Sequence, residues 1–190
     1  MQEAEALIDP VAQKILTIAG NDCFGTDDET LADAVGKALK QQQHTLAVAE
    51  SCTGGGLGQA LTSVAGSSAY FLGGVIAYDN RIKQALLGVK ADTLAAHGAV
   101  SGAVAEQMAE GVRSRLDTDW GLSVTGIAGP GGGSADKPVG LVYLGLASRT
   151  QTAHLECRFG ASRGRDWVRL MSTSTALDWL RRRLSQGKDD

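Results

Sequence analysis

Five short apolar runs alternate with segments of helical periodicity along this chain. The runs fall at residues 45–49, 70–78, 120–125, 139–147 and 152–159. Such alternation is typical of a mainly parallel sheet with helices on both faces. The last two runs are joined by Ser148–Gln151, which is too short for a crossover, so we expect that pair to be antiparallel. The sequence therefore predicts an α/β protein: a three-layer α/β/α sandwich with a mixed, mainly parallel sheet of about five strands.

The chain of 190 residues, 43% of them hydrophobic, is long enough for one domain with a sizeable core. We expect residues 1–25 to form an N-terminal helical extension and residues 26–187 to form the main domain. The extension has an apolar spacing at Val11, Ile15 and Ile18.

Two helix starts can be read from capping residues. Thr26 and Glu29 have the spacing of a capping box before an apolar helical face, and Ser101 is placed to cap a later helix. The final helix is expected to place one set of residues on one side: Trp167, Leu170, Met171, Ser174, Leu177 and Leu184.

Composition argues against several classes of function. The net charge is −3 and the longest basic run, Arg181–Arg183, lies late in a helical pattern, so we expect no nucleic-acid partner. No membrane span or secretory signal is visible, and three scattered cysteines indicate free thiols, so a cytoplasmic protein is expected. The three isolated histidines predict no metal site. The extra N-terminal helix and the low net charge suit a homo-oligomer.

Two glycine-rich segments follow strand-like runs, where α/β sheets bind ligands. They read TLAVAESCTGGGLGQAL at 45–61 and SVTGIAGPGGG at 123–133. Neither contains a P-loop, a dinucleotide-binding fingerprint or a G-x-S-x-G elbow. From the residues alone, Ser51 suits a helix cap better than a nucleophile, and Cys52 suits a small buried apolar residue.

A third segment, GGVIAYDNRIK, brings Tyr78 and, five residues later, Lys83. A lysine and a tyrosine beside a serine make a proton-transfer set that needs no histidine. For Lys83 to act as a base near neutral pH, burial must lower its pKa from about 10.4 to roughly 7 or 8.

Several ordered segments resemble the CinA C-terminal domain family, the bacterial nicotinamide-nucleotide amidases. The matching segments are AESCTGG at 49–55, GSSAYFLGGVIAYDNRIKQALLGV at 66–89, HGAVS at 97–101, TGIAGPGGG at 125–133 and KPVG at 137–140. The resemblance spans about residues 28–184, so only the amidase part of longer family members is expected here. It implies hydrolysis of the carboxamide of nicotinamide mononucleotide to nicotinate mononucleotide and ammonia, in pyridine-nucleotide salvage, without metal or organic cofactor.

The resemblance also implies roles for individual residues. It makes Ser51 the nucleophile and Tyr78 and Lys83 its proton-transfer partners. The implied substrate-binding residues are Thr53, Gly54, Gly55, Ser68, Thr125, Gly126, Arg165 and Arg163. The amides of Gly54 and Gly55 would hold either the oxyanion or the substrate phosphate.

Two questions stay open at this point. Either Arg163 or Arg165 would bind the phosphate, because an apparent short insertion precedes the final helix. Two rival functions also remain: a non-catalytic nucleotide-sensing or protein-interaction module of this competence-linked family, and an amidase for a different amide.

Overall fold

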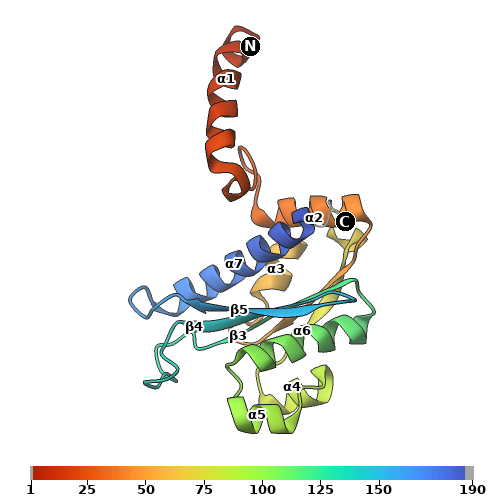
Figure 1. Cartoon of the computed structure of the whole chain (residues 1–190), viewed down its shortest axis with the longest axis vertical. Coiled ribbons are helices and arrows are strands. Elements are labelled where there is room, and N and C mark those ends of the chain that lie inside the picture. The colour runs from red at the N-terminus through yellow and green to blue at the C-terminus, as the bar shows by residue number, and fades with distance from the viewer. Residues whose placement is uncertain (1, 187–190) are drawn as a thin grey trace.

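The computed structural model describes residues 2–186, with side chains from residue 7 onward. Its centre is a five-stranded sheet whose strands are ordered β2-β1-β3-β4-β5 (Figure 1). The strands are β1 (Leu46–Glu50), β2 (Phe71–Ile76), β3 (Trp120–Gly126), β4 (Leu141–Ala147) and β5 (Thr152–Arg158). β1 pairs in parallel with β2 and β3, whereas β4 is antiparallel to both β3 and β5. The predicted mixed sheet and the antiparallel final pair are both confirmed.

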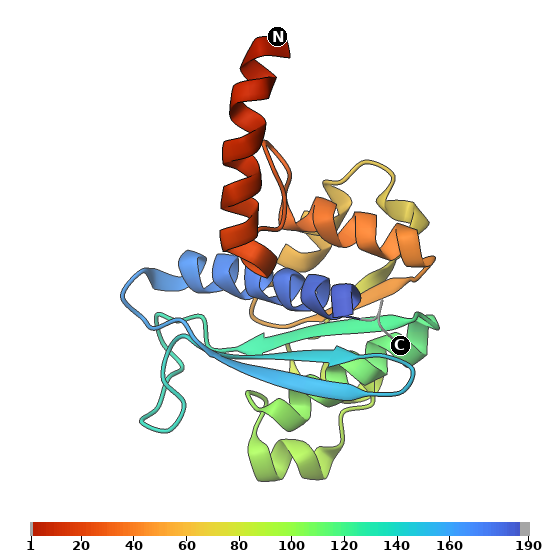
Figure 2. The same ribbon diagram turned by 45° about the horizontal axis from the view of Figure 1, so that its top comes forward.

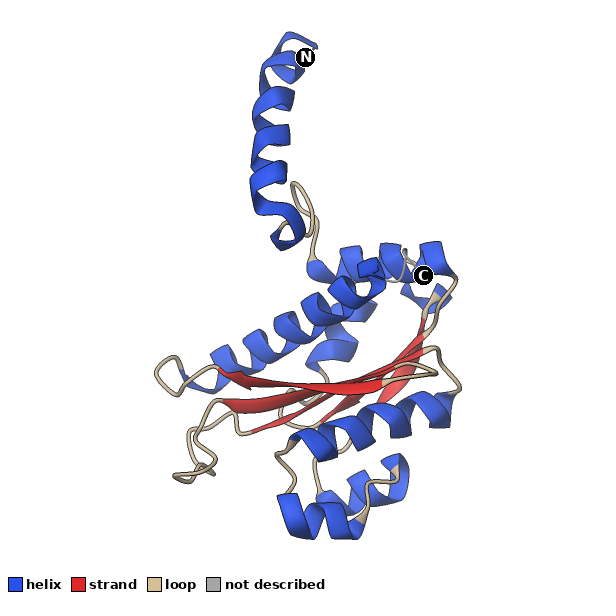
Figure 3. Cartoon of the chain, in the orientation of Figure 1, coloured by secondary structure: helices blue, strands red, loops and turns tan. Residues whose placement is uncertain are grey.

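Helices cover both faces of the sheet, which gives the predicted three layers (Figures 1 and 3). One face carries α2 (Leu31–Gln42), α3 (Gly56–Thr62) and α7 (Gly164–Gln186). The other carries α4 (Asn80–Leu87), α5 (Ala91–His97) and α6 (Gly102–Leu116). All five residues of β1 are buried, because a central strand between two helical layers has no solvent-facing side.

The first turn of α2 corrects one expectation from the sequence. The capping box is formed by Thr30 and Asp33, whose side chains each accept a hydrogen bond from the other's backbone amide, and not by Thr26 and Glu29. Thr26 and Glu29 have the same spacing, and the Glu29 carboxylate accepts from the Thr26 amide at 3.4 Å, but α2 begins later, at Leu31. Glu29 also pairs with Lys37, a residue of that helix. Ser101 does cap α6, as its hydroxyl accepts from the Val104 amide at 3.4 Å.

The buried face of α7 is also rotated from the expected one. Leu177 and Leu184 are buried as expected, but Leu170 is 57% exposed. The buried stripe instead includes Val168, Ser172, Ala176 and Leu180. Two of these residues, Ser172 and Ala176, are small, so the size of a side chain was a poor guide to the buried side.

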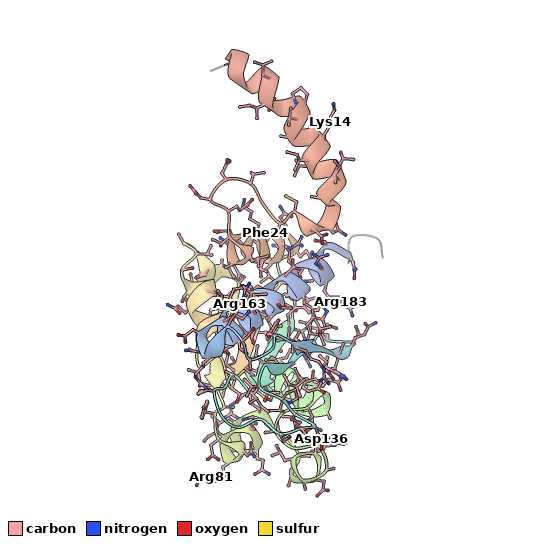
Figure 4. All side chains as sticks on the ribbon, turned by 90° about the vertical axis from the view of Figure 1, so that its left-hand side faces the viewer. Lys14, Phe24, Arg81, Asp136, Arg163 and Arg183 are labelled. Carbon is pink, nitrogen blue, oxygen red and sulfur yellow. The ribbon has the colours of Figure 1, made fainter. Side chains whose placement is uncertain are left out.

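The N-terminal helix α1 (Gln2–Ala19) projects away from the sandwich (Figures 1 and 2). Figure 4 shows Lys14 on this projecting part. The short turn η1 (Gly20–Asp22) that follows is tied to α7, where Arg181 donates to the Asn21 carbonyl at 2.6 Å and Arg182 pairs with Asp22 at 2.8 Å. The division into an extension and a main domain stays a prediction, and its proposed end at residue 187 lies outside the described residues.

All three cysteines are free, with Cys52 and Cys157 buried and Cys23 partly buried. None of the helices within residues 2–186 combines the length and apolar character needed to cross a membrane.

Candidate active site

The carboxyl ends of β1, β2 and β3 meet at one edge of the sheet because these three strands run in parallel. A cavity of about 270 Å³ opens at this edge. The glycine-rich loop that follows β3 forms one wall, through residues between 127 and 132. The polar side chains around the cavity come from segments far apart in sequence: Ser51, Tyr78, Asn80, Lys83, Thr125 and Arg165.

Ser51 and Lys83 form the centre of the site. Ser51 follows β1, Lys83 lies in the first turn of α4, and the Lys83 Nζ donates to the Ser51 Oγ at 3.2 Å. The same Nζ donates to the carbonyl oxygens of Ala77 at 2.8 Å and Tyr78 at 3.2 Å. Lys83 is 1% exposed and Ser51 is 8% exposed, so the pair is shielded from bulk water.

Burial sets the protonation chemistry of this pair and of its neighbour. Burial lowers the pKa of Lys83, because the ammonium loses hydration, while the nearby Asp79 carboxylate opposes this shift. Asp79 is exposed and pairs with Arg81 at 3.0 Å. Burial raises the pKa of the Cys52 thiol to about 11. The thiol therefore stays protonated at neutral pH, and the side chain that contacts the Lys83 amine is the Ser51 hydroxyl.

Tyr78 lies at the cavity but contacts Lys83 differently from what the sequence suggested. Its backbone carbonyl, and not its hydroxyl, accepts from the Lys83 Nζ. The Tyr78 side chain is 65% exposed, and its hydroxyl has no hydrogen bond within the described part of the chain. In this arrangement Tyr78 lines the cavity without joining the Ser51–Lys83 hydrogen bond.

The amides of Gly54 and Gly55 are already occupied. The Gly54 amide donates to the Ser51 carbonyl at 3.2 Å, and the Gly55 amide donates to the Glu50 carboxylate at 3.0 Å. Both glycines have positive φ, of 59° and 103°, which makes the tight turn accessible. Neither amide is therefore free to hold an oxyanion or a phosphate, so this structure supports neither of the two expected roles.

Glu50 explains why these amides turn inward. Its carboxylate is 2% exposed and also accepts from the amides of Leu57 at 3.1 Å and Gly58 at 2.9 Å, so it caps α3 from within. A buried carboxylate at this helix start also repels a second anion. The signal in the sequence was an acidic residue that ends an otherwise apolar strand. The amides of Cys52 and Thr53 donate to no oxygen acceptor among the residues described.

The two candidate arginines lie in different places. Arg165 lines the cavity, and its guanidinium donates to the Gly129 carbonyl in the loop wall at 2.8 Å. Arg163, labelled in Figure 4, instead stacks over the ring of Trp167 at 4.4 Å. Arg165 is thus the arginine that a ligand in the cavity would meet.

The remaining predicted binding residues divide into two groups. Thr125 and Gly126 line the cavity, and the Thr125 hydroxyl donates to the Ala99 carbonyl at 2.8 Å. Ser68 does not line the cavity. It is exposed in the short turn η2 (Ser67–Ala69), which precedes β2 and lies at the amino end of the parallel strands. Thr53 is buried and borders a different cavity.

Asn80 is a cavity residue that the sequence reasoning missed. It lies between Tyr78 and Lys83 in the segment already singled out, directly after the Asp79 cap of α4. Its position in that segment was the available signal. No group of three or more His, Cys, Asp or Glu side chains within the described chain is arranged to hold a metal ion.

The fold and the site together define a class: a three-layer α/β protein with a buried serine–lysine pair at the carboxyl ends of its parallel strands. Comparison with known families then identifies the lineage. The CinA C-terminal domain model matches residues 28–184. The chain belongs to the CinA C-terminal domain family.

Curated relatives extend the match beyond the family model. A CinA-like protein from Cyanothece sp. is 64% identical over 184 residues, which cover 96% of this chain and 44% of the relative. A CinA-like protein from Rippkaea orientalis is 62% identical with the same coverage. The chain thus spans less than half the length of these relatives. Because 96% of the chain is covered, the match includes most of residues 1–25, which the family model leaves out.

Solved structures share the fold. The competence/damage inducible protein CihA from Agrobacterium tumefaciens is 44% identical in sequence, with a TM-score of 0.79. The structural alignment covers 86% of this chain and 98% of that protein's chain. A CinA superfamily protein from Klebsiella pneumoniae is 33% identical, with a TM-score of 0.78, and covers 82% of this chain and 96% of its own.

Proposed function

We propose that this chain hydrolyses the carboxamide of nicotinamide mononucleotide to nicotinate mononucleotide and ammonia, in pyridine-nucleotide salvage. Membership of a family that includes nicotinamide-nucleotide amidases supports the substrate. The observation that carries the chemistry is the 3.2 Å contact between the Lys83 Nζ and the Ser51 Oγ, two buried residues that line the cavity.

The hydrogen bonds of Lys83 suit a base. A neutral amine has two N–H donors and one lone pair. The carbonyls of Ala77 and Tyr78 take the two donors, which leaves the lone pair to accept the Ser51 proton. After that transfer the resulting ammonium has three donors for three oxygen atoms, so both protonation states fit without rearrangement.

The reaction then proceeds in two halves. The Ser51 oxygen attacks the carboxamide carbon as Lys83 takes its proton, and the C–N bond breaks as Lys83 returns that proton to the leaving ammonia. Water next attacks the acyl ester, gives a proton to Lys83 and releases the acid, and the proton returns to Ser51. The Cys52 amide, which belongs to a residue of this cavity and donates to no oxygen acceptor among the residues described, is the candidate oxyanion donor, and such a donor contributes about 2.7–4 kcal/mol in comparable sites.

Ammonia release measures this function directly. The purified chain is assayed with nicotinamide mononucleotide, free nicotinamide and the nicotinamide dinucleotide, and we expect release from the mononucleotide above the other two. Equal or greater release from another amide would assign a different amidase. No release from any of them, with binding retained, would favour the nucleotide-sensing module.

Arg165 is the proposed phosphate ligand, and this role predicts a change in KM. Arg165→Gln removes a charge-assisted contact, so KM for the mononucleotide should rise about 10- to 100-fold while kcat changes less. Arg163→Gln is the matched control, because Arg163 stacks on Trp167 outside the cavity and its loss should leave KM nearly unchanged. The opposite pattern in steady-state kinetics would exchange the two assignments.

A further inference from the structure

We propose that Glu50 is a positioning residue for the nucleophile: its buried carboxylate fastens the turn that carries Ser51 to the start of α3. Glu50 is the last residue of β1 and directly precedes Ser51. It is 2% exposed, does not border the cavity and takes no part in the proton transfers described above. The inference rests on the proposed amide hydrolysis at Ser51 and adds a residue that never touches the substrate.

Three hydrogen bonds hold the Glu50 carboxylate. Its Oε2 accepts from the amides of Gly55 at 3.0 Å and Leu57 at 3.1 Å, and its Oε1 accepts from the amide of Gly58 at 2.9 Å. Both oxygens of a carboxylate can accept, so the group matches N–H donors that a helix leaves unpaired at its start. Hydrogen bonds to a charged acceptor are stronger than neutral ones, so the carboxylate fixes the start of α3 relative to β1.

The turn between β1 and α3 is therefore held at both ends. At the β1 end, the Ser51 amide donates to the Val124 carbonyl of β3 at 3.0 Å. At the α3 end, the Glu50 carboxylate binds the three amides. Between these ends lie Gly54 and Gly55, whose backbone freedom would otherwise let the turn move. A displacement of about 1 Å in a reacting group can cost about 100-fold in rate, so the placement of the Ser51 hydroxyl depends on this tie.

The backbone of Glu50 holds the other member of the serine–lysine pair. Its carbonyl accepts from the Ala77 amide at 2.7 Å, and the Ala77 carbonyl accepts from the Lys83 Nζ at 2.8 Å. The Glu50 carboxylate lies on the face of the sheet that carries α3, whereas Lys83 belongs to α4 on the opposite face (Figure 1). A substitution of the Glu50 side chain therefore alters the hold on Ser51 and leaves the hold on Lys83 in place.

Glu50→Gln tests the proposal, because glutamine has the same length but keeps one acceptor oxygen, and its NH₂ group then faces at least one backbone N–H. We expect kcat for ammonia release from nicotinamide mononucleotide to fall about 100-fold, with KM within about threefold of the parent value because Glu50 lies outside the cavity. Arg169 still donates to the Thr53 carbonyl, so the turn should loosen while the chain stays folded.

Asp33→Asn is the matched control. The Asp33 carboxylate caps α2 by accepting from the Thr30 amide at 3.0 Å, and it does not border the cavity. The same change from acid to amide should there leave kcat within about twofold of the parent chain. Glu50→Asp keeps the charge but is one methylene shorter, so its kcat should lie between those of the parent chain and Glu50→Gln. It also replaces the glutamine variant if that variant does not fold.

The proposal is overturned if a folded Glu50 variant keeps the parent kcat, if the loss appears in KM alone, or if Asp33→Asn loses as much activity. If the parent chain itself releases no ammonia, the proposed function fails and crystal structures decide the positioning role. The distance between the Lys83 Nζ and the Ser51 Oγ, 3.2 Å in the parent chain, should then exceed about 3.5 Å in Glu50→Gln. An unchanged distance would show that Ser51 is held without Glu50.

Discussion

Ser51→Ala should reduce kcat for ammonia release from nicotinamide mononucleotide by about 10⁴-fold or more, because removing a nucleophile disables the whole catalytic unit. The alanine chain should still bind the mononucleotide in calorimetry, since Ser51 contributes one hydroxyl to the cavity. Steady-state ammonia release and binding are measured on the same preparation.

Ser68→Ala is the matched control for this experiment. Ser68 is exposed at the amino end of the parallel strands, so its loss should leave turnover within about twofold of the parent chain. If Ser51→Ala retains turnover while it binds normally, another group attacks the carboxamide. The buried Cys52 thiol would then need reconsideration despite its pKa of about 11.

Lys83→Met should cause a loss of similar size, and the Ser51→Ala, Lys83→Met double variant should be little worse than either single one, since the two act as a unit. In the parent chain kcat/KM should rise with pH and level off, because only the neutral amine accepts the serine proton. Burial lowers the Lys83 pKa, so the rise should come below the value of about 10.4 of an exposed lysine. An activity that falls as pH rises through that range would contradict the base role.

The lowered pKa of Lys83 should also make the free energy of unfolding depend on pH. Between the lowered folded pKa and the unfolded value of about 10.4, the unfolded chain binds more protons than the folded one, so the free energy of unfolding rises with pH. Lys83→Met lacks this dependence. Urea unfolding should therefore show that the free energy of unfolding of the parent chain, relative to that of Lys83→Met, is higher at pH 10 than at pH 7. Lys90 is exposed, so the free energy of unfolding of Lys90→Met should change with pH as that of the parent chain does. Parallel curves for all three chains would show that the Lys83 pKa is not lowered.

The layers of the fold could be predicted because periodicity is local. Apolar runs and helical spacings can each be recognised within a short segment of sequence. The connection of four residues from Ser148 to Gln151 is too short for a crossover, so strands β4 and β5 must pair antiparallel. Local sequence patterns were misleading where two segments carried the same capping pattern. Thr26 and Thr30 are both followed three residues later by an acidic side chain, and only the packed structure shows that Thr30 caps the helix.

The site was predictable to the extent that topology follows from the strand pattern. Ser51 and Lys83 follow two strands that prove to be parallel neighbours, so their meeting is a consequence of strand direction. By the same rule Ser68 lies at the other end of the sheet, away from the cavity, because it precedes strand β2. The prediction that Ser68 binds substrate came from the family resemblance alone and did not consider the end of the sheet at which Ser68 lies.

By itself, then, the sequence determined the strands, the helices between them and the end of the sheet where Ser51 and Lys83 would lie, because each depends on residues close together in the chain. Only the tertiary structure decided which groups are free to act. Glu50 occupies the glycine amides, Arg165 enters the cavity while Arg163 stacks on Trp167, and Arg169 reaches the Thr53 carbonyl 116 residues away. These contacts join distant segments, and whether a donor is already satisfied depends on what packing brings next to it.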